Sequence, residues 1–142
     1  MMGRRPVLAA GLALGASVLS GCGLRGRTLD EALNEAAGNV DGVTSSALET
    51  VTGAEFQRAI RGRVEISAAR REQVLEIFGE VMTALVDAAY AQADADSEGS
   101  RVVGAITALS SDGEEYGIWD LRPDLEQSAG RLDAVLLSDF AE

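Results

Sequence analysis

Residues 68–92 (AARREQVLEIFGEVMTALVDAAYAQ) form the most regular segment of the chain and decide its predicted fold. Apolar side chains recur there at intervals of three and four residues, a spacing that places them on one face of an α-helix. Charged residues, among them Glu72, Glu76 and Asp87, fill most of the opposite face, and Ser67 precedes the segment as a helix cap. The pattern predicts one long amphipathic helix with an apolar face made of Val74, Ile77, Phe78, Val81, Met82, Leu85, Val86 and Ala89.

Residues 40–52 and 55–66 precede this helix and predict a β-hairpin. In the second run, polar side chains alternate with apolar ones, which is the two-residue period of a half-buried strand. The apolar side of the second run consists of Phe56, Ile60, Val64 and Ile66. The corresponding residues of the first run are Val43, Ala47 and Val51. Residues 52–54 (TGA) lie between the runs and have the composition of a turn.

Two more strands are predicted after the helix, at residues 102–109 and 115–121 (EYGIWDL). The turn between them contains Asp112 and Gly113, a pair that readily adopts the positive φ angles of a type I′ turn. The elements then follow in the order ββαββ. We expect an α+β fold in which the two hairpins form an antiparallel sheet and the long helix packs on one face of it.

Both ends of the predicted domain allow two interpretations. Thr28 and Glu31 fit a capping box at the start of a short helix, but a helix of that length needs packing to persist, and the alternative is a disordered tether. Near the other end, Pro123 favours a helix start. Gly130 interrupts that helix, and residues 132–137 would equally suit a strand.

Charge divides the chain into two parts. The sequence carries 12 basic residues, all of them arginine, and 23 acidic residues, for a net charge of −11. No acidic residue occurs before Cys22, and in that segment Arg4 and Arg5 precede the uncharged apolar run of residues 7–19. A basic start followed by an apolar run shorter than the ~20 residues that span a bilayer is typical of a secretory signal.

Leu19, Ser20, Gly21 and Cys22 follow that run and resemble the lipobox of bacterial lipoproteins. The resemblance implies that a diacylglyceryl group is attached to the Cys22 thiol and that the signal is cleaved between Gly21 and Cys22. The alternative is an ordinary secretory signal whose small-residue cleavage site happens to contain a cysteine. Together with the absence of lysine, the motif makes the chain similar to small uncharacterised lipoproteins of actinobacteria.

The lipobox also sets the expected segments of the chain. We expect a cleaved lipoprotein signal peptide at 1–21, a lipid-anchored tether or short helix at 22–38, and a single α+β domain at 39–142. Because the only cysteine is used for the anchor, no thiol remains for a disulfide or for a soft metal ligand. Two acyl chains anchor a protein to a membrane more durably than one. Together with the secretory signal, the lipid group leads us to expect this protein on the extracytoplasmic face of the cell membrane.

The residue types exclude most common enzymatic chemistry. The chain has no histidine and no lysine, which rules out Ser-His-Asp and Cys-His systems, the common zinc sites and Ser-Lys pairs. Carboxylate pairs remain, as in glycoside hydrolysis. Glu114 and Glu115 lie beside a predicted turn, and we interpret them as solvated charges. We therefore predict a protein that is not an enzyme, with no catalytic residue, no metal site and no cofactor.

Residues 94–99 (DADSEG) place carboxylates at the first, third and fifth positions before a glycine, as at the start of an EF-hand loop. The twelfth position, which should supply a bidentate glutamate, is Ala105. The segment that follows is predicted as a strand instead of the exit helix of an EF-hand. We interpret residues 94–99 as a solvated loop that ends the long helix.

Tyr116 and Trp119 are the candidate partner-binding residues. Both lie on the predicted strand at 115–121, where their odd spacing places them on opposite faces of the sheet. One of the two rings must then point away from the helix. That ring would form an exposed patch unless the C-terminal residues cover it.

Nucleic acid is disfavoured as a partner, because an acidic surface repels phosphate and the chain has no basic stripe. The expected partners are membrane lipid, through acylated Cys22, and an envelope protein or small ligand. We predict a lipid-anchored extracytoplasmic lipoprotein with a binding or accessory role. The alternatives are a lipid or small-molecule carrier, which requires an apolar cavity between helix and sheet, and a hydrolase, which requires carboxylates that converge in a cleft.

Overall fold

A computed structural model describes residues 28–53, 57–92 and 98–141. Within these residues the helices are α3 (Leu29–Gly38), α4 (Arg71–Gln92), α6 (Ile118–Leu121) and α7 (Pro123–Ala129). The strands are β1 (Val43–Thr52), β2 (Arg58–Ile66), β3 (Ile106–Leu109) and β4 (Glu115–Tyr116). Two short 3-10 helices, η3 (Leu132–Ala134) and η4 (Leu137–Phe140), follow α7.

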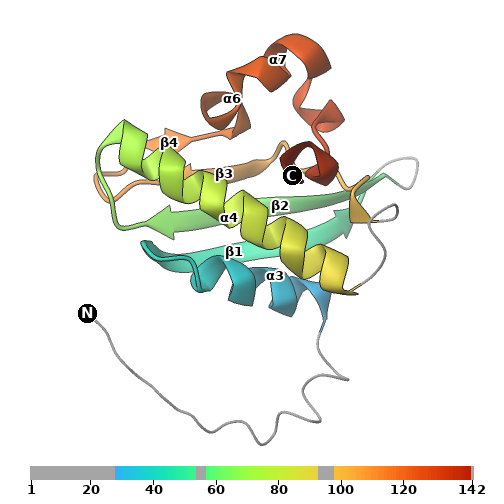
Figure 1. Cartoon of the computed structure of the whole chain (residues 1–142), viewed down its shortest axis with the longest axis horizontal. Coiled ribbons are helices and arrows are strands. Elements are labelled where there is room, and N and C mark those ends of the chain that lie inside the picture. The colour runs from blue at the N-terminus through green and yellow to red at the C-terminus, as the bar shows by residue number, and fades with distance from the viewer. Residues whose placement is uncertain (1–27, 54–56, 93–97, 142) are drawn as a thin grey trace, which may run out of the picture.

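The strands form one four-stranded sheet in the order β1-β2-β3-β4. Helices α3 and α4 lie side by side over one face of the sheet, and the segment from α6 to η4 packs beside α4 (Figure 1). The α+β class and the long helix predicted from the sequence are confirmed.

The first predicted hairpin is present. Strands β1 and β2 pair antiparallel, with Leu48 opposite Gly62 and Val51 opposite Ala59, and the register shifts once between Val43 and Ser45. The predicted apolar side of β2 faces the helices and is buried at Ile60, Val64 and Ile66. Phe56, the fourth residue predicted for that side, lies outside the described residues.

The prediction of an entirely antiparallel sheet is wrong, because β2 and β3 are parallel, with Gly62 opposite Ile106 and Glu65 opposite Leu109. The physical reason is the length of the connection between them. Helix α4 carries the chain back across the sheet, so that β3 starts at the end where β2 also started. Strands β3 and β4 then pair antiparallel, as predicted for the second hairpin.

The predicted strand at 115–121 is also wrong beyond Tyr116. The Asp120 carboxylate accepts a hydrogen bond from the backbone N–H of Gly117 at 2.9 Å, and this contact starts the helical turn α6. The strand predicted at 102–109 is shorter as well, because regular pairing begins at Ile106 and Val102 makes only isolated bridges.

The C-terminal segment combines the two interpretations that the sequence left open. Pro123 occupies the first turn of α7, and Gly130 ends the helix with a φ of 80°. The chain then forms the two 3-10 helices instead of a strand, and Leu136 makes a single bridge to Val102. Buried side chains attach this segment to the core: Leu125, Val135, Leu137 and Phe140.

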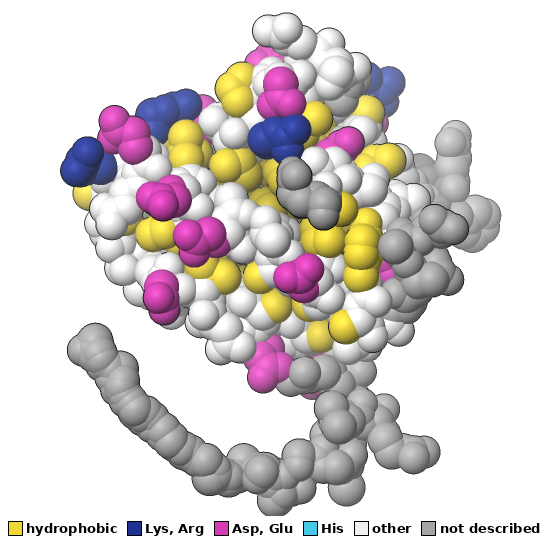
Figure 2. Space-filling model, in the orientation of Figure 1, with side chains coloured by type: hydrophobic (Ala, Val, Ile, Leu, Met, Phe, Trp, Pro, Cys, Tyr) yellow, Lys and Arg dark blue, Asp and Glu magenta, His cyan; other side chains and the backbone are white. Residues whose placement is uncertain are grey.

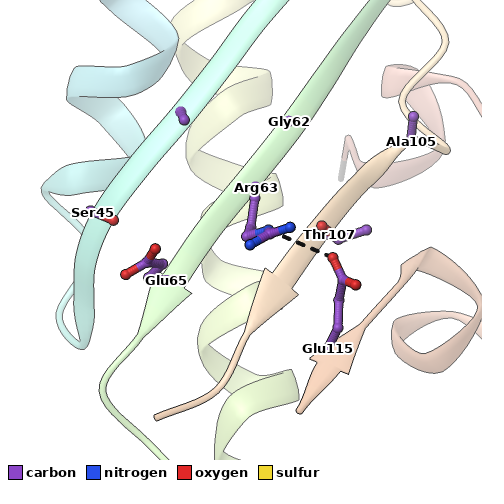
Figure 3. A pocket seen from close by; sticks show the side chains of 8 residues that line it. Ser45, Gly62, Arg63, Glu65, Ala105, Thr107 and Glu115 are labelled. Atoms are coloured by element: carbon purple, nitrogen blue, oxygen red, sulfur yellow. Dashed lines mark ion pairs between the residues drawn. The ribbon is translucent and has the colours of Figure 1, made fainter. Parts of the chain in front are cut away.

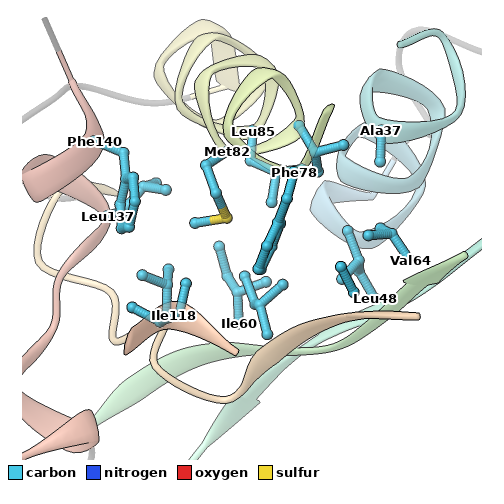
Figure 4. Packing of buried hydrophobic residues seen from close by; sticks show 14 of the residues in the cluster. Ala37, Leu48, Ile60, Val64, Phe78, Met82, Leu85, Ile118, Leu137 and Phe140 are labelled. Atoms are coloured by element: carbon cyan, nitrogen blue, oxygen red, sulfur yellow. The ribbon is translucent and has the colours of Figure 1, made fainter. Parts of the chain in front are cut away.

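The core lies between α4 and the sheet (Figure 4). Phe78, Met82 and Leu85 of α4 are fully buried, as are Ile60 and Val64 of β2. Burial of an aliphatic or aromatic side chain of this size stabilises the fold by about 1.5–3 kcal/mol. Residues from the C-terminal segment complete the same cluster, so the described residues share one core.

Helix α3 is capped as predicted and packs on the sheet. Thr28 and Glu31 exchange two side-chain to backbone hydrogen bonds, at 3.0 and 3.1 Å, which form the capping box. Leu33 and Ala37 are buried in the core. The segment at 29–38 is therefore a helix that belongs to the packed structure.

The same helix covers the outer edge of β1. The Asn34 side-chain amide donates to the backbone oxygen of Leu48 and accepts from its backbone N–H, both at 2.8 Å. The Asp30 carboxylate accepts from the backbone N–H of Thr50 at 2.9 Å and from its hydroxyl at 2.6 Å. These side chains satisfy backbone groups that an edge strand otherwise leaves without partners.

Candidate functional site

The face of the sheet that points away from α3 and α4 is not covered by any of the described residues. Its outward side chains come from alternate positions on all four strands. We call this surface the open sheet face, and it consists of Ser45, Ala47, Glu49, Arg61, Arg63, Glu65, Thr107, Leu109 and Glu115.

The centre of the open sheet face is hollow. The hollow has a volume of about 550 Å³ and is lined by Ser45, Ala47, Gly62, Arg63, Glu65, Ala105, Thr107 and Glu115. Figure 3 shows that the small side chains of β1 and β3 leave the space, and that Arg63 projects into it between Glu65 and Glu115. The hollow is open to solvent, whereas an internal cavity would be closed.

Gly62 lets β1 and β2 approach each other closely beneath this hollow. Its φ is +135°, and a Cβ atom built on it would lie 2.1 Å from the backbone oxygen of Ala47. No side chain fits at that distance, and L residues rarely adopt that φ. The shape of the open sheet face therefore depends on a glycine at this position.

Two ion pairs flank the hollow. Arg63 Nε lies 3.6 Å from Glu115 Oε2, and Arg61 Nε lies 2.7 Å from Glu49 Oε2. All four side chains are about half exposed, at 50–57%. Exposed pairs of this kind contribute about 0.2–1 kcal/mol each, so their stabilising effect is small. The guanidinium and carboxylate groups remain accessible to a polar or charged ligand.

The turn between β3 and β4 borders the open sheet face. A second hollow of about 340 Å³ lies there, between this turn and the end of β2. The Ser110 hydroxyl donates a hydrogen bond to Asp112, and this bond lowers the pKa of the Asp112 carboxyl, with a smaller contribution from the backbone N–H of Glu114. Gly113 has a φ of 91°, as its place in this turn requires.

Two further carboxyl groups have lowered pKa values, both away from the open sheet face. A hydrogen bond from Arg122 lowers the pKa of Asp124, and a hydrogen bond from Arg131 lowers the pKa of Asp133. Each pair is two residues apart in the sequence and exposed to solvent. They are local contacts at the ends of α7 and η3.

The prediction that Tyr116 and Trp119 lie on opposite faces of one strand is wrong, because the strand ends at Tyr116. Tyr116 faces the core and is 8% exposed, and the Arg71 guanidinium lies over its ring, 5.5 Å from the ring centre. Trp119 is on α6 and packs, partly buried, against the core. At β4 the open sheet face carries Glu115 instead of an aromatic ring.

The predicted lipidation site lies outside the described residues. This holds for Cys22 and for the three residues of the lipobox before it, Leu19, Ser20 and Gly21. In the part of the chain that the structure describes, no helix has the length and apolarity that a membrane span requires.

Glu98 is a buried acid, and its interpretation as a solvated loop charge is wrong. It is 5% exposed, and its carboxylate lies 2.5 Å from Arg101 Nε and 3.9 Å from Arg58 Nη1. Asp94 and Asp96 lie outside the described residues. Over residues 28–53, 57–92 and 98–141, no three metal-binding side chains of the types His, Cys, Asp and Glu come together.

Sequence reasoning missed three residues that shape these surfaces. Gly62 lies inside a regular strand pattern, and an isolated glycine in such a pattern signals a close backbone approach. Asp30 and Asn34 are four residues apart and therefore lie on one face of α3. Their contacts with β1 depend on how the helix is placed in three dimensions, which a single sequence does not contain.

Comparison with known proteins gives no relative for this fold and site. No protein-family model matches the chain, and no curated protein and no solved structure matches it either.

Proposed function

We propose that this protein is a lipid-anchored extracytoplasmic lipoprotein with a non-enzymatic binding or accessory role, and that it binds its membrane-proximal partner through the open sheet face. The observation that carries this proposal is the solvent-open hollow of about 550 Å³ on a sheet face that no described residue covers. Its anchor is the lipobox cysteine, Cys22.

The anchor and the domain are close together in the sequence. Five residues separate Cys22 from Thr28, and a fully extended chain of that length spans about 20 Å. An acylated Cys22 would hold the domain near the membrane surface. Such tethering raises the effective concentration of the protein toward any partner in the same membrane.

The contents of the core favour a surface site over an internal one. A carrier needs an apolar cavity between helices and sheet, and in the described structure that space is occupied by fully buried side chains such as Phe78, Met82 and Ile60. In the hollow of the open sheet face the carboxylates are Glu65 and Glu115, and Arg63 lies beside Glu115. We therefore prefer binding to either alternative.

The anchor is tested by mass spectrometry of protein extracted from membranes. We expect the chain to begin at Cys22 with a diacylglyceryl group on its sulfur. The matched variant, Cys22→Ser, should lose the lipid and leave the membrane fraction. A chain that begins at Met1 with a free thiol would contradict the lipid anchor.

The binding face is tested separately, by photo-crosslinking in intact cells. A photoreactive side chain at Ala47, in the hollow, should crosslink to an envelope component, whereas the same group at Ser128 on α7 should not. Thr107→Arg fills the hollow and should abolish the adduct formed from position 47. Equal adducts from both positions, or an adduct that persists in Thr107→Arg, would contradict binding at this face.

A further inference from the structure

Arg63 is the cation that lines the hollow of the open sheet face, and its guanidinium group donates no hydrogen bond to any described residue. The ion pair that it forms with Glu115 is 3.6 Å long, which exceeds the ordinary length of a hydrogen bond. Arg61, two residues away on the same strand, instead donates to Glu49 at 2.7 Å. A guanidinium group carries five N–H donors in a fork that fits a carboxylate. Arg63 therefore presents its donors to the hollow.

Glu65 supplies a carboxylate beside Arg63. The two residues are two positions apart on β2, so their side chains leave the same face of the strand about 7 Å apart. Figure 3 shows Glu65 on the side of β1, near Ser45, and Arg63 on the side of β3. None of the arginines in residues 28–53, 57–92 and 98–141 pairs with Glu65. The hollow thus holds an open guanidinium group and an unpaired carboxylate as neighbours.

The charges around the hollow disfavour a ligand that carries one sign of charge alone. The net charge of −11 and the two flanking carboxylates, Glu65 and Glu115, repel a simple anion. Figure 2 shows that acidic side chains are also spread over the helical side, whereas the basic ones lie in the upper part of that view. Arg63, in turn, repels a simple cation. A ligand with a carboxylate and an ammonium group matches both signs of the hollow.

We propose that the partner of the open sheet face is bound through a zwitterionic group of dipeptide size, with its carboxylate on Arg63 and its ammonium on Glu65. An extended chain of two residues spans about 7 Å, which matches the spacing of these two side chains on β2. The inference rests on the proposed function, because it names the chemistry of the group that the same hollow binds.

The remaining lining of the hollow suits the peptide unit between two such charges. Its volume of about 550 Å³ lies within the range of roughly 300–1,000 Å³ that is usual for small-molecule sites. Ser45 and Thr107 line it with hydroxyl groups, which can donate to a peptide oxygen and accept from a peptide N–H. Ala47 and Gly62 keep the floor low between them.

The test uses dialanine as the probe. The full chain is kept in dodecyl maltoside micelles, empty micelles provide the blank, and binding is measured by saturation-transfer difference NMR at physiological salt. We expect saturable binding in the millimolar range, because Arg63 is half exposed and charge pairs at such positions are weak. No saturable signal from dialanine at tens of millimolar would overturn the inference.

Two blocked forms of the probe identify the charged groups that bind. N-acetyl-dialanine lacks the ammonium, and dialanine amide lacks the carboxylate. Each should bind about fivefold more weakly than dialanine, because one of two charge pairs is lost. Equal binding of all three probes would overturn the inference.

Four variants assign each charge to its residue. Arg63→Gln should weaken dialanine about fivefold without weakening dialanine amide, and Glu65→Gln should weaken dialanine similarly without weakening N-acetyl-dialanine. The matched controls, Arg131→Gln and Glu126→Gln, change the same charges at exposed positions away from the open sheet face. They should change the affinity less than about twofold. Equal weakening by a variant and its control would show unspecific attraction and overturn the inference.

Competition in cells separates this inference from the proposed function. Excess dialanine should suppress the adduct that forms from a photoreactive group at position 47. An adduct that persists with dialanine but is lost in Thr107→Arg would overturn the zwitterionic ligand and leave the binding face in place. Equal adducts from positions 47 and 128 would contradict the proposed function itself, and the inference with it.

Discussion

The two sides of this molecule differ in charge. The helical side carries Glu76, Glu80 and Asp87 on α4, and none of the arginines in the described residues pairs with them. On the open sheet face, Arg61 and Arg63 are each paired with a glutamate. The net charge of −11 is therefore not spread evenly. The comparison shows that an acidic composition is compatible with one nearly balanced surface, so overall charge alone does not say which partners each side accepts.

The two faces of the sheet also differ in how deeply their side chains are buried. Toward the helices, β2 and β3 present Ile60, Val64 and Ile106, all fully buried. On the other side they present Arg61, Arg63, Glu65, Thr107 and Leu109, which are exposed or half-exposed. Stability should therefore depend on one face and binding on the other.

The largest expected loss of stability comes from a substitution on the covered side of the sheet. Phe78→Ala removes a fully buried ring from α4 and should lower the free energy of unfolding by about 3–5 kcal/mol. The matched change on the open sheet face, Thr107→Ala, should stay within about 0.5 kcal/mol. Urea denaturation followed by circular dichroism measures both, and similar losses would show that the open sheet face is not free in the native protein.

A smaller effect is expected at the backbone beneath the open sheet face. Gly62→Ala places a methyl group against the backbone oxygen of Ala47 and forces alanine into a positive φ, which should cost about 2–3 kcal/mol. Gly113→Ala also has a positive φ, but nothing lies near its Cβ position, so it should cost about 1 kcal/mol. The difference between the urea unfolding midpoints of the two variants measures the effect of the steric clash at Gly62. Equal midpoints would show that the clash does not affect stability.

The contact between α3 and the edge of β1 should contribute less. Asn34→Ala leaves the backbone N–H and oxygen of Leu48 without their side-chain partners and should cost about 1–2 kcal/mol. Amide hydrogen exchange at Leu48 should become faster. Asn39→Ala, at the exposed end of the same helix, should change stability by less than about 0.5 kcal/mol. Unchanged exchange at Leu48 in Asn34→Ala would speak against this contact.

The smallest effect concerns pH at the β3–β4 turn beside the open sheet face. The hydrogen bond from Ser110 lowers the pKa of Asp112 below its ordinary value of 3.8. The stabilisation that results is present above pH 3.8 and is lost as the pH falls through the lower pKa of the folded state. Ser110→Ala should move the pKa of Asp112 up toward 3.8, as measured by carboxyl NMR titration. An unchanged pKa in that variant would mean that the hydroxyl is not the cause.

The sequence predicts best where a local period decides the structure. Helix α4 has apolar residues at helical spacing from Val74 to Ala89, and no short-range competitor disturbs the pattern. The hairpin of β1 and β2 was predicted from the period of two in residues 55–66. The side predicted for the first run is wrong at Ala47, which lies on the open sheet face, because Leu48 is the residue of β1 that is buried. The capping box at Thr28 needs only residues within one turn, so its contacts also follow from the sequence.

Prediction fails where distant residues decide the structure. Parallel pairing of β2 with β3 depends on the end of the sheet at which the chain re-enters after α4. The periodicity of the sequence contains no information about this position. Beyond Tyr116 the predicted strand is replaced by the turn α6, at whose start the Gly117 N–H donates to the Asp120 carboxylate. The open sheet face needs the register of four strands, so its residues do not stand out in the sequence. Tyr116 and Trp119 were selected from the sequence because aromatic residues are conspicuous there, whether they are exposed or buried in the structure.

The edge contact of Asn34 has one more consequence, for copies that are crowded together. One carboxamide supplies both a donor and an acceptor, so α3 completes the hydrogen bonding of β1 at Leu48 without being extended itself. A strand from another molecule finds no vacant backbone position there. Lateral growth of sheets into fibres, the usual hazard of a long exposed strand, is therefore opposed on this side at Leu48 and, through Asp30, at Thr50.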